Sequence, residues 1–76
     1  MQETYRDYLI TAVRISGGVM VTAIPKKGAD FRLKALHDAF KTNVPSQNRI
    51  AKEVESLKTE IDDIYRDLKK QETNHV

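Results

Sequence analysis

The chain has 76 residues, no cysteine and a formal net charge of +2. A chain this short buries only about 60% of its unfolded surface, so its core is small and gains from added support. Without cysteine that support cannot be a disulfide, and thiolate zinc sites and cysteine nucleophiles are excluded too. Self-association is the simplest remaining support, and the lack of cysteine favours a cytoplasmic location.

The N-terminal third predicts a β-hairpin. Residues 8–15 and 19–24 are rich in β-branched side chains, which favour strands. Between them, Ser16-Gly17-Gly18 supplies residues that adopt the positive φ angles of a tight turn. Pro25 ends the second run, because it has no N–H to donate to a sheet. The alternative is a helix over residues 3–14, whose apolar side chains also fall on one helical face.

The next segment predicts a short helix. Asp30 is a good N-cap residue. Leu33, Leu36 and Phe40 then recur at a spacing that places them on one helical face. Residues 42–46 are rich in turn formers and end this helix.

Residues 46–70 predict a long helix, in which Asn43 or Ser46 serves as the cap and Pro45 suits the first turn. Residues 71–76 are polar and are expected to fray. The predicted fold is therefore one α+β domain with the order ββαα. Residues 1–45 form a head of hairpin and short helix, and residues 46–70 form a coiled-coil-like helix.

The long helix carries a narrow apolar ladder with alternating steps of four and three residues, typical of a heptad repeat. Its members are Ile50, Val54, Leu57, Ile61, Ile64 and Leu68. We expect a homodimer joined at least partly through this ladder, with parallel helices, because an antiparallel pair would place acidic flanking residues together. The alternative is that the ladder packs on its own chain. The helix is about 36 Å long and a six-residue strand about 20 Å, so Ile61 to Leu68 are expected to extend beyond the head.

Basic residues are concentrated in the first 50 residues, which hold eight basic and four acidic side chains, whereas residues 51–76 hold five and seven. Such a basic region suits nucleic acid or an acidic partner. The expected basic contact surface consists of Lys26, Lys27, Arg32, Lys34, Lys41 and Arg49.

The sequence carries no nucleophile motif, phosphate-binding loop or metal-ligand spacing. We therefore expect no enzyme, no catalytic residues, no cofactor and no metal. No apolar stretch approaches the roughly 20 residues that span a bilayer, so no membrane partner is expected. The expected function is a small non-enzymatic module that binds another protein, as an adaptor, inhibitor or regulatory accessory protein, and acts as a homodimer. The alternative is a dimeric DNA-binding transcription regulator whose basic head contacts phosphates.

Overall fold

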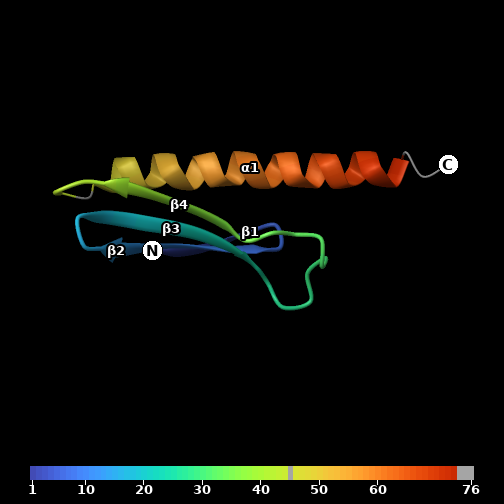
Figure 1. Ribbon diagram of the computed structural model, residues 1–76, viewed down its shortest axis with the longest axis horizontal. Helices are drawn as coiled ribbons and strands as arrows, with labels where there is room; N and C mark the ends of the chain where they lie inside the picture. The colour runs from blue at the N-terminus through green and yellow to red at the C-terminus, as the bar shows by residue number, and fades with distance from the viewer. Residues whose placement is uncertain (45, 74–76) are drawn as a thin grey trace.

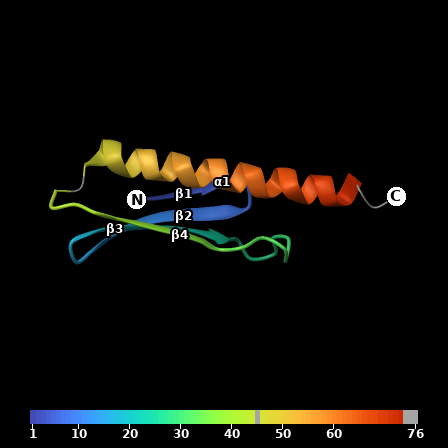
Figure 2. The same cartoon turned by 45° about the horizontal axis from the view of Figure 1, so that its top comes forward.

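The computed structural model describes residues 1–44 and 46–73, which form a four-stranded antiparallel sheet and one long helix laid along one of its faces (Figures 1 and 2). The strands are neighbours in chain order. They are β1 (Gln2–Tyr5), β2 (Tyr8–Ile15), β3 (Gly18–Pro25) and β4 (Leu36–Lys41), and the helix is α1 (Gln47–Thr73). The predicted α+β class is confirmed, but its ββαα order is wrong in part.

The predicted hairpin is confirmed as β2 and β3, which excludes the helix over residues 3–14. The two strands pair in register with Thr11 opposite Thr22, and the turn between them places Gly17 at a φ of 79°. Gly18 is required for a different reason. A Cβ on this residue would collide with the carbonyl oxygen of Phe40 on the neighbouring strand, so only glycine lets β3 and β4 approach so closely here.

The sequence analysis did not predict β1. This strand joins β2 through a two-residue turn, in which Arg6 adopts a φ of 52°. Such hairpin turns are usually marked by glycine, asparagine or aspartate at the positions with positive φ. Arginine at this position hides the turn, and the polar composition of Gln2–Tyr5 hides the strand.

The predicted short helix is absent, and its second half is the strand β4. Alternate residues of β4 face the core, so Leu36 and Phe40 lie on one side of the strand. Their spacing would also place them on one side of a helix. Pairing with the otherwise free edge of β3 decides in favour of the strand. Asp30 is not a helix cap. Its carboxylate accepts the Arg32 N–H at 2.9 Å and its carbonyl accepts the Leu33 N–H at 3.0 Å, so it stabilises a turn.

The long helix begins where the sequence predicts. The Ser46 hydroxyl accepts the Arg49 N–H at 3.1 Å, which confirms Ser46 as the N-cap. The helix continues to Thr73, three residues beyond the predicted end. Pro45 and residues 74–76 of the expected frayed tail lie outside the described residues. Within the described residues, no helix is long and apolar enough to cross a membrane.

The core is a single apolar layer between the sheet and α1. It is built from inward-facing residues of β2 and β3, one loop residue and one face of the helix. Its buried members are Tyr8, Ile10, Val19, Val21, Ala23, Leu33, Val54, Leu57 and Ile61. Because α1 covers only one side of the sheet, the other side is left without a covering layer (Figure 1).

Candidate interaction surface

The helical ladder packs against the sheet of its own chain, as the alternative interpretation proposed. Val54, Leu57 and Ile61 have exposed fractions of 2%, 2% and 0%, and the other ladder residues are partly buried against the same core. The expectation that Ile61 extends beyond the head is therefore wrong. Strands β2 and β3 have eight residues each, two more than the strand length assumed, and Leu33 of the loop that follows β3 is buried in the same core. An interface through the ladder would be limited to the exposed parts of Ile50, Ile64 and Leu68, and dimerisation through it stays a prediction.

The side of the sheet that faces away from α1 is a broad apolar surface, which we call the open face. Side chains alternate between the two faces of a strand, so the burial pattern and the register assign its members. They are Gln2 and Thr4 on β1, Leu9, Thr11, Val13 and Ile15 on β2, Met20, Thr22 and Ile24 on β3, and His37, Ala39 and Lys41 on β4. Val13 is 49% exposed, Ile15 43%, Met20 38% and Ile24 42%.

The register arranges the open face in rows that cross the strands. The Leu9 row holds Thr4, Leu9 and Ile24, and the threonine row holds Gln2, Thr11, Thr22 and His37. The Val13 row holds Val13, Met20 and Ala39, and the Ile15 row holds Ile15, Gly18 and Lys41. A mainly apolar row therefore lies on each side of a central polar row. This near-symmetry about the threonine row matters for what the surface can bind.

The open face is almost free of charge. None of the open-face residues is acidic, and the one with a permanent charge, Lys41, lies at the end of the edge strand. The face carries no Phe, Tyr or Trp, and its one ring on which a nucleic-acid base could stack is the imidazole of His37. Its chemistry suits an apolar protein surface.

A hollow of about 260 Å³ opens at one end of the open face, beside Gly18. It is lined by Ile15, Gly18, Ala39 and Lys41 together with the adjoining turn and Phe40.

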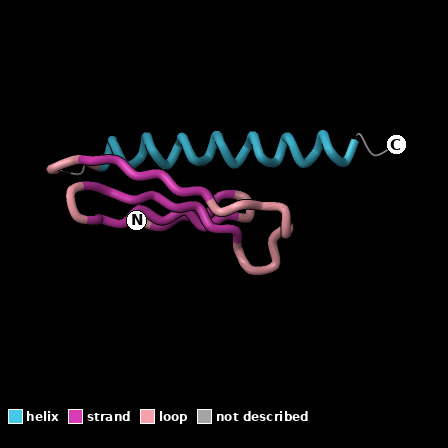
Figure 3. Tube along the Cα trace, viewed as in Figure 1, coloured by secondary structure: helices cyan, strands magenta, loops and turns pink. Residues whose placement is uncertain are grey.

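The loop between β3 and β4, residues 26–35, lies at the opposite end of the sheet. Its first part dips past the sheet on the side away from α1 (Figures 1 and 3), and its second part returns to the helix, where Arg32 pairs with Glu72. This loop carries Phe31, whose side chain is 93% exposed. Its neighbours are held in place. Arg32 forms an ion pair with Asp30 at 2.7 Å and Leu33 is buried in the core. Phe31 therefore projects into solvent from a fixed loop.

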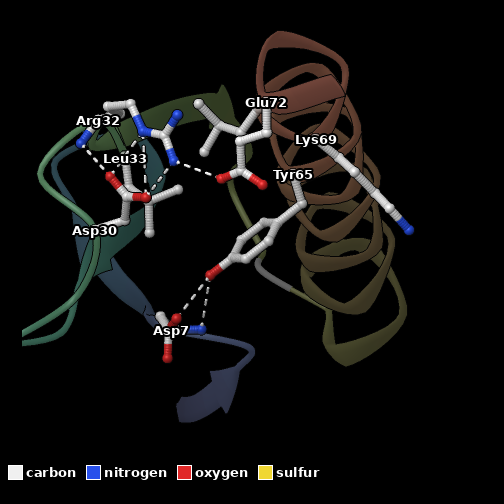
Figure 4. A pocket seen from close by; sticks show the side chains of 8 residues that line it. Asp7, Asp30, Arg32, Leu33, Tyr65, Lys69 and Glu72 are labelled. Carbon is white, nitrogen blue, oxygen red and sulfur yellow. Dashed lines mark hydrogen bonds and ion pairs between the residues drawn. The ribbon is translucent and has the colours of Figure 1, made fainter. Parts of the chain in front are cut away.

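A second hollow, of about 350 Å³, lies where the end of α1 meets the β1–β2 turn and the loop (Figure 4). Its polar side chains bind one another. Arg32 bridges Asp30 and Glu72 at 2.7 and 3.0 Å, and the Tyr65 hydroxyl donates to the Asp7 carboxylate at 3.0 Å. These contacts tie the helix to two loops, so we interpret this hollow as structural.

The shifted pKa values follow from the same structural contacts. Hydrogen bonds from Arg32 lower the pKa of Asp30 to about 2. The Tyr5 hydroxyl, which donates to Asp62 at 2.8 Å, lowers the pKa of Asp62, and Arg6 adds to this effect. Each of these carboxylates is held ionised by a partner within the fold, which is unlike a general acid or base poised near neutral pH.

The predicted basic residues form two groups at opposite ends of the sheet. Four of them, Lys26, Lys27, Arg32 and Lys34, belong to the loop that follows β3, whereas Lys41 is paired with the first residue of β3. Arg49 is near that second end, where its guanidinium stacks on Phe40 and forms an ion pair with Glu53. The structure therefore does not bring the six residues together on one surface.

The edges of the predicted hairpin are not free, since β1 pairs with β2 and β4 pairs with β3. The sheet now ends in β1 and β4. On β4, the Asp38 carboxylate accepts the Ala39 N–H at 2.9 Å, and a charged residue at this position discourages strand addition. Strand addition at β4 is therefore disfavoured, and the open face is the candidate surface for a partner.

No protein-family model matches the chain, and the comparisons with curated proteins and with solved structures gave no match. Across residues 1–44 and 46–73, no group of three or more potential ligands could hold a metal ion. The interpretation of the open face therefore rests on the chain itself.

The open face is not among the predicted contact surfaces, although the sequence contains a signal for it. A strand with one solvated face alternates apolar and polar residues. The runs Leu9–Ile10 and Val19–Met20–Val21 do not alternate, and Val13 and Ile24 also lie on the side away from the core. Such continuous runs are typical of strands covered on both faces. The helix covers one face, so the sequence indicates that something covers the other.

Proposed function

We propose that the protein is a non-enzymatic interaction module that acts as a homodimer, in which the open faces of two copies pack together. The observation that carries this proposal is the group of exposed apolar side chains on the open face of β2 and β3, which has no acidic residue among its members. Exposed apolar patches of this kind mark interaction sites on soluble proteins. We further propose a cytoplasmic location and no cofactor.

The open face is small for a stable dimer. Strands β2 and β3 are about 27 Å long, whereas β1 has only four residues and β4 six, at about 3.4 Å per residue and about 4.8 Å between strands. Two such faces bury about 850 Å² together, below the roughly 1,000 Å² of a specific protein interface. The proposed contact therefore needs good packing, and contacts beyond the flat sheet would strengthen it.

The charge pattern favours a second copy over an unlike partner. The open face bears no negative charge, and Lys41 stands at its margin, so two copies meet without burying a charge at the centre. An ionised group at the centre would have to be desolvated without a partner. A face adapted to an acidic protein or to phosphates would instead carry cations along its middle.

The test is the oligomeric state of two matched variants. Met20→Lys places a cation in the centre of the open face, and Gln71→Lys places the same charge on an exposed helical residue. We expect Met20→Lys to raise the dimer Kd at least about 100-fold, because burying an unpaired ammonium costs several kcal/mol. Gln71→Lys should leave the Kd unchanged, and both should keep the circular dichroism of the wild type.

Sedimentation equilibrium measures these constants. A wild-type chain that stays monomeric at about 100 µM, where a weak specific interface should be populated, would overturn the proposal. Equal dimerisation of wild type and Met20→Lys would also overturn it, because the dimer would then use another surface.

A further inference from the structure

We infer that the two copies pair about a twofold axis that runs across the strands along the threonine row, so that Phe31 of each copy enters the hollow beside Gly18 of the other. This inference rests on the proposed dimer. It adds the orientation of the copies and names Phe31 as the anchor of the interface.

The rows of the open face fit this axis. Rotation about the threonine row places the Leu9 row of one copy on the Val13 row of the other, and the threonine row on itself. Apolar side chains then meet apolar side chains on both sides of the axis. On the axis itself, Thr11, Thr22 and His37 of one copy meet the same residues of the other. An isologous interface requires this kind of self-complementary surface.

The same rotation exchanges the two ends of the sheet. The loop with Phe31 follows the last residue of β3, and the hollow adjoins the first residue, Gly18. The first part of the loop dips past the sheet on the side where the second copy would lie (Figure 3). Each loop therefore reaches toward the hollow of the other copy, and the pair of contacts adds area to an interface that the flat sheet leaves below the usual lower limit.

Charge argues against the other orientation. A twofold axis parallel to the strands would bring the two loops together, and with them Lys26, Lys27 and Lys34 of both copies. All three lysines are exposed, and gathering six ammonium groups at one end is unfavourable. The axis across the strands keeps the two loops apart. In that arrangement each loop lies beside Lys41 of the other copy, which is the one cation on the open face.

Disulfide trapping tests this orientation directly, because the natural chain has no cysteine. We expect the double variant Phe31→Cys/Ala39→Cys to form a covalent dimer on mild oxidation. Within one chain Ala39 pairs with Met20, which lies five residues, or about 17 Å, along β3 from the end that leads into the loop, whereas a disulfide requires Cα atoms closer than about 7 Å. A bond between them must therefore join two chains.

Matched variants separate the outcomes. Phe31→Cys/Glu60→Cys, with its second cysteine on α1, and the single variant Phe31→Cys should stay monomeric on non-reducing gels. Rapid cross-linking of Phe31→Cys alone would show that the loops meet, and would overturn the inference. An open-face dimer in which the Phe31→Cys/Ala39→Cys pair fails to cross-link would also overturn it while leaving the proposed function intact.

A second measurement uses no cysteine. Phe31→Ala should raise the dimer Kd by about 30-fold, as expected when an aromatic anchor at an interface is truncated. Because Phe31 is 93% exposed in the single chain, the variant should fold as the wild type does. An unchanged Kd in a chain that dimerises through the open face would refute the role of Phe31.

Discussion

The substitution Ile61→Asp distinguishes the two uses of the helical ladder. If the ladder were a dimer seam, as its heptad spacing suggests, the change would separate two folded monomers. In the structure Ile61 has no exposed surface and packs in the core of its own chain. The change should therefore unfold the protein.

The magnitude follows from the burial. Truncating a buried isoleucine to alanine costs about 2–5 kcal/mol. A chain of 76 residues has a free energy of unfolding of about 4–11 kcal/mol, at about 0.05–0.15 kcal/mol per residue. Ile61→Ala should then lower the Tm by about 10 °C or more, since 1 kcal/mol shifts it by about 4–8 °C in a domain this small. Ile61→Asp adds the cost of a buried carboxylate and should abolish the folded state.

Far-UV circular dichroism during thermal unfolding, together with sedimentation, provides the assay. The control is Met20→Asp, an equally drastic change on the open face, which should keep the folded spectrum and lose only the dimer. A folded, monomeric Ile61→Asp with the wild-type Tm would refute the reasoning, because it would show that the ladder is the interface and not the core.

Four further predictions concern stability and binding. The pKa of Asp30 is lowered from 3.8 to about 2, so the contribution of its carboxylate to stability is present above pH 3.8 and is lost as the pH falls toward 2. The Tm measured across this range should therefore fall less in Asp30→Asn than in the wild type. Hydrogen bonding with Asp38 raises the pKa of Glu53. The contribution of protonated Glu53 to stability is therefore present below the ordinary pKa of 4.5 and is lost as the pH rises through the raised pKa. Glu53→Gln should raise the Tm at pH 7 and leave it unchanged at pH 3. Gly18→Ala should destabilise the fold by about 1–3 kcal/mol, because the new Cβ collides with the next strand. Gly17→Ala should destabilise it less, because this change strains only a positive φ. Urea unfolding that finds Gly17→Ala to be the less stable variant would contradict this prediction. Finally, the split basic groups predict only weak retention on heparin at about 50 mM salt, and tight binding to random duplex that collapses by about 200 mM would instead support the DNA-binding alternative.

Local signals predicted the elements that local residues determine. The turn at Gly17 and the cap at Ser46 were both identified correctly, because glycine and serine act there through their own backbone and hydroxyl groups. The strand β4 could not be identified in this way. Leu36 and Phe40 fit both a helix and a strand, and only the free edge of β3, a partner outside the segment, decides between them.

The candidate site was harder to predict, because a heptad spacing does not say what covers it. The ladder from Ile50 to Leu68 is equally suited to a partner helix and to a sheet, and two sheet strands, Gln2–Tyr5 and Leu36–Lys41, are not predicted as strands. Compared with a six-residue strand of about 20 Å, a helix of about 36 Å is too long to be covered. Four strands and the loop around Leu33 provide enough apolar surface for it.

The open face can be inferred in the same way, by asking which apolar side chains of the sheet remain uncovered. Once α1 is assigned to one side of the sheet, Val13, Ile15, Met20 and Ile24 remain as exposed apolar side chains on central strands, where a monomer gains little from them. Strands β2 and β3 lack the polar alternation of a solvated face and so have the composition of strands buried on both sides. In the proposed dimer, a second copy would supply a covering layer that is apolar and free of acidic groups. The support that a short chain without cysteine needs is therefore expected from self-association through the sheet, rather than through the helix on which the heptad repeat stands.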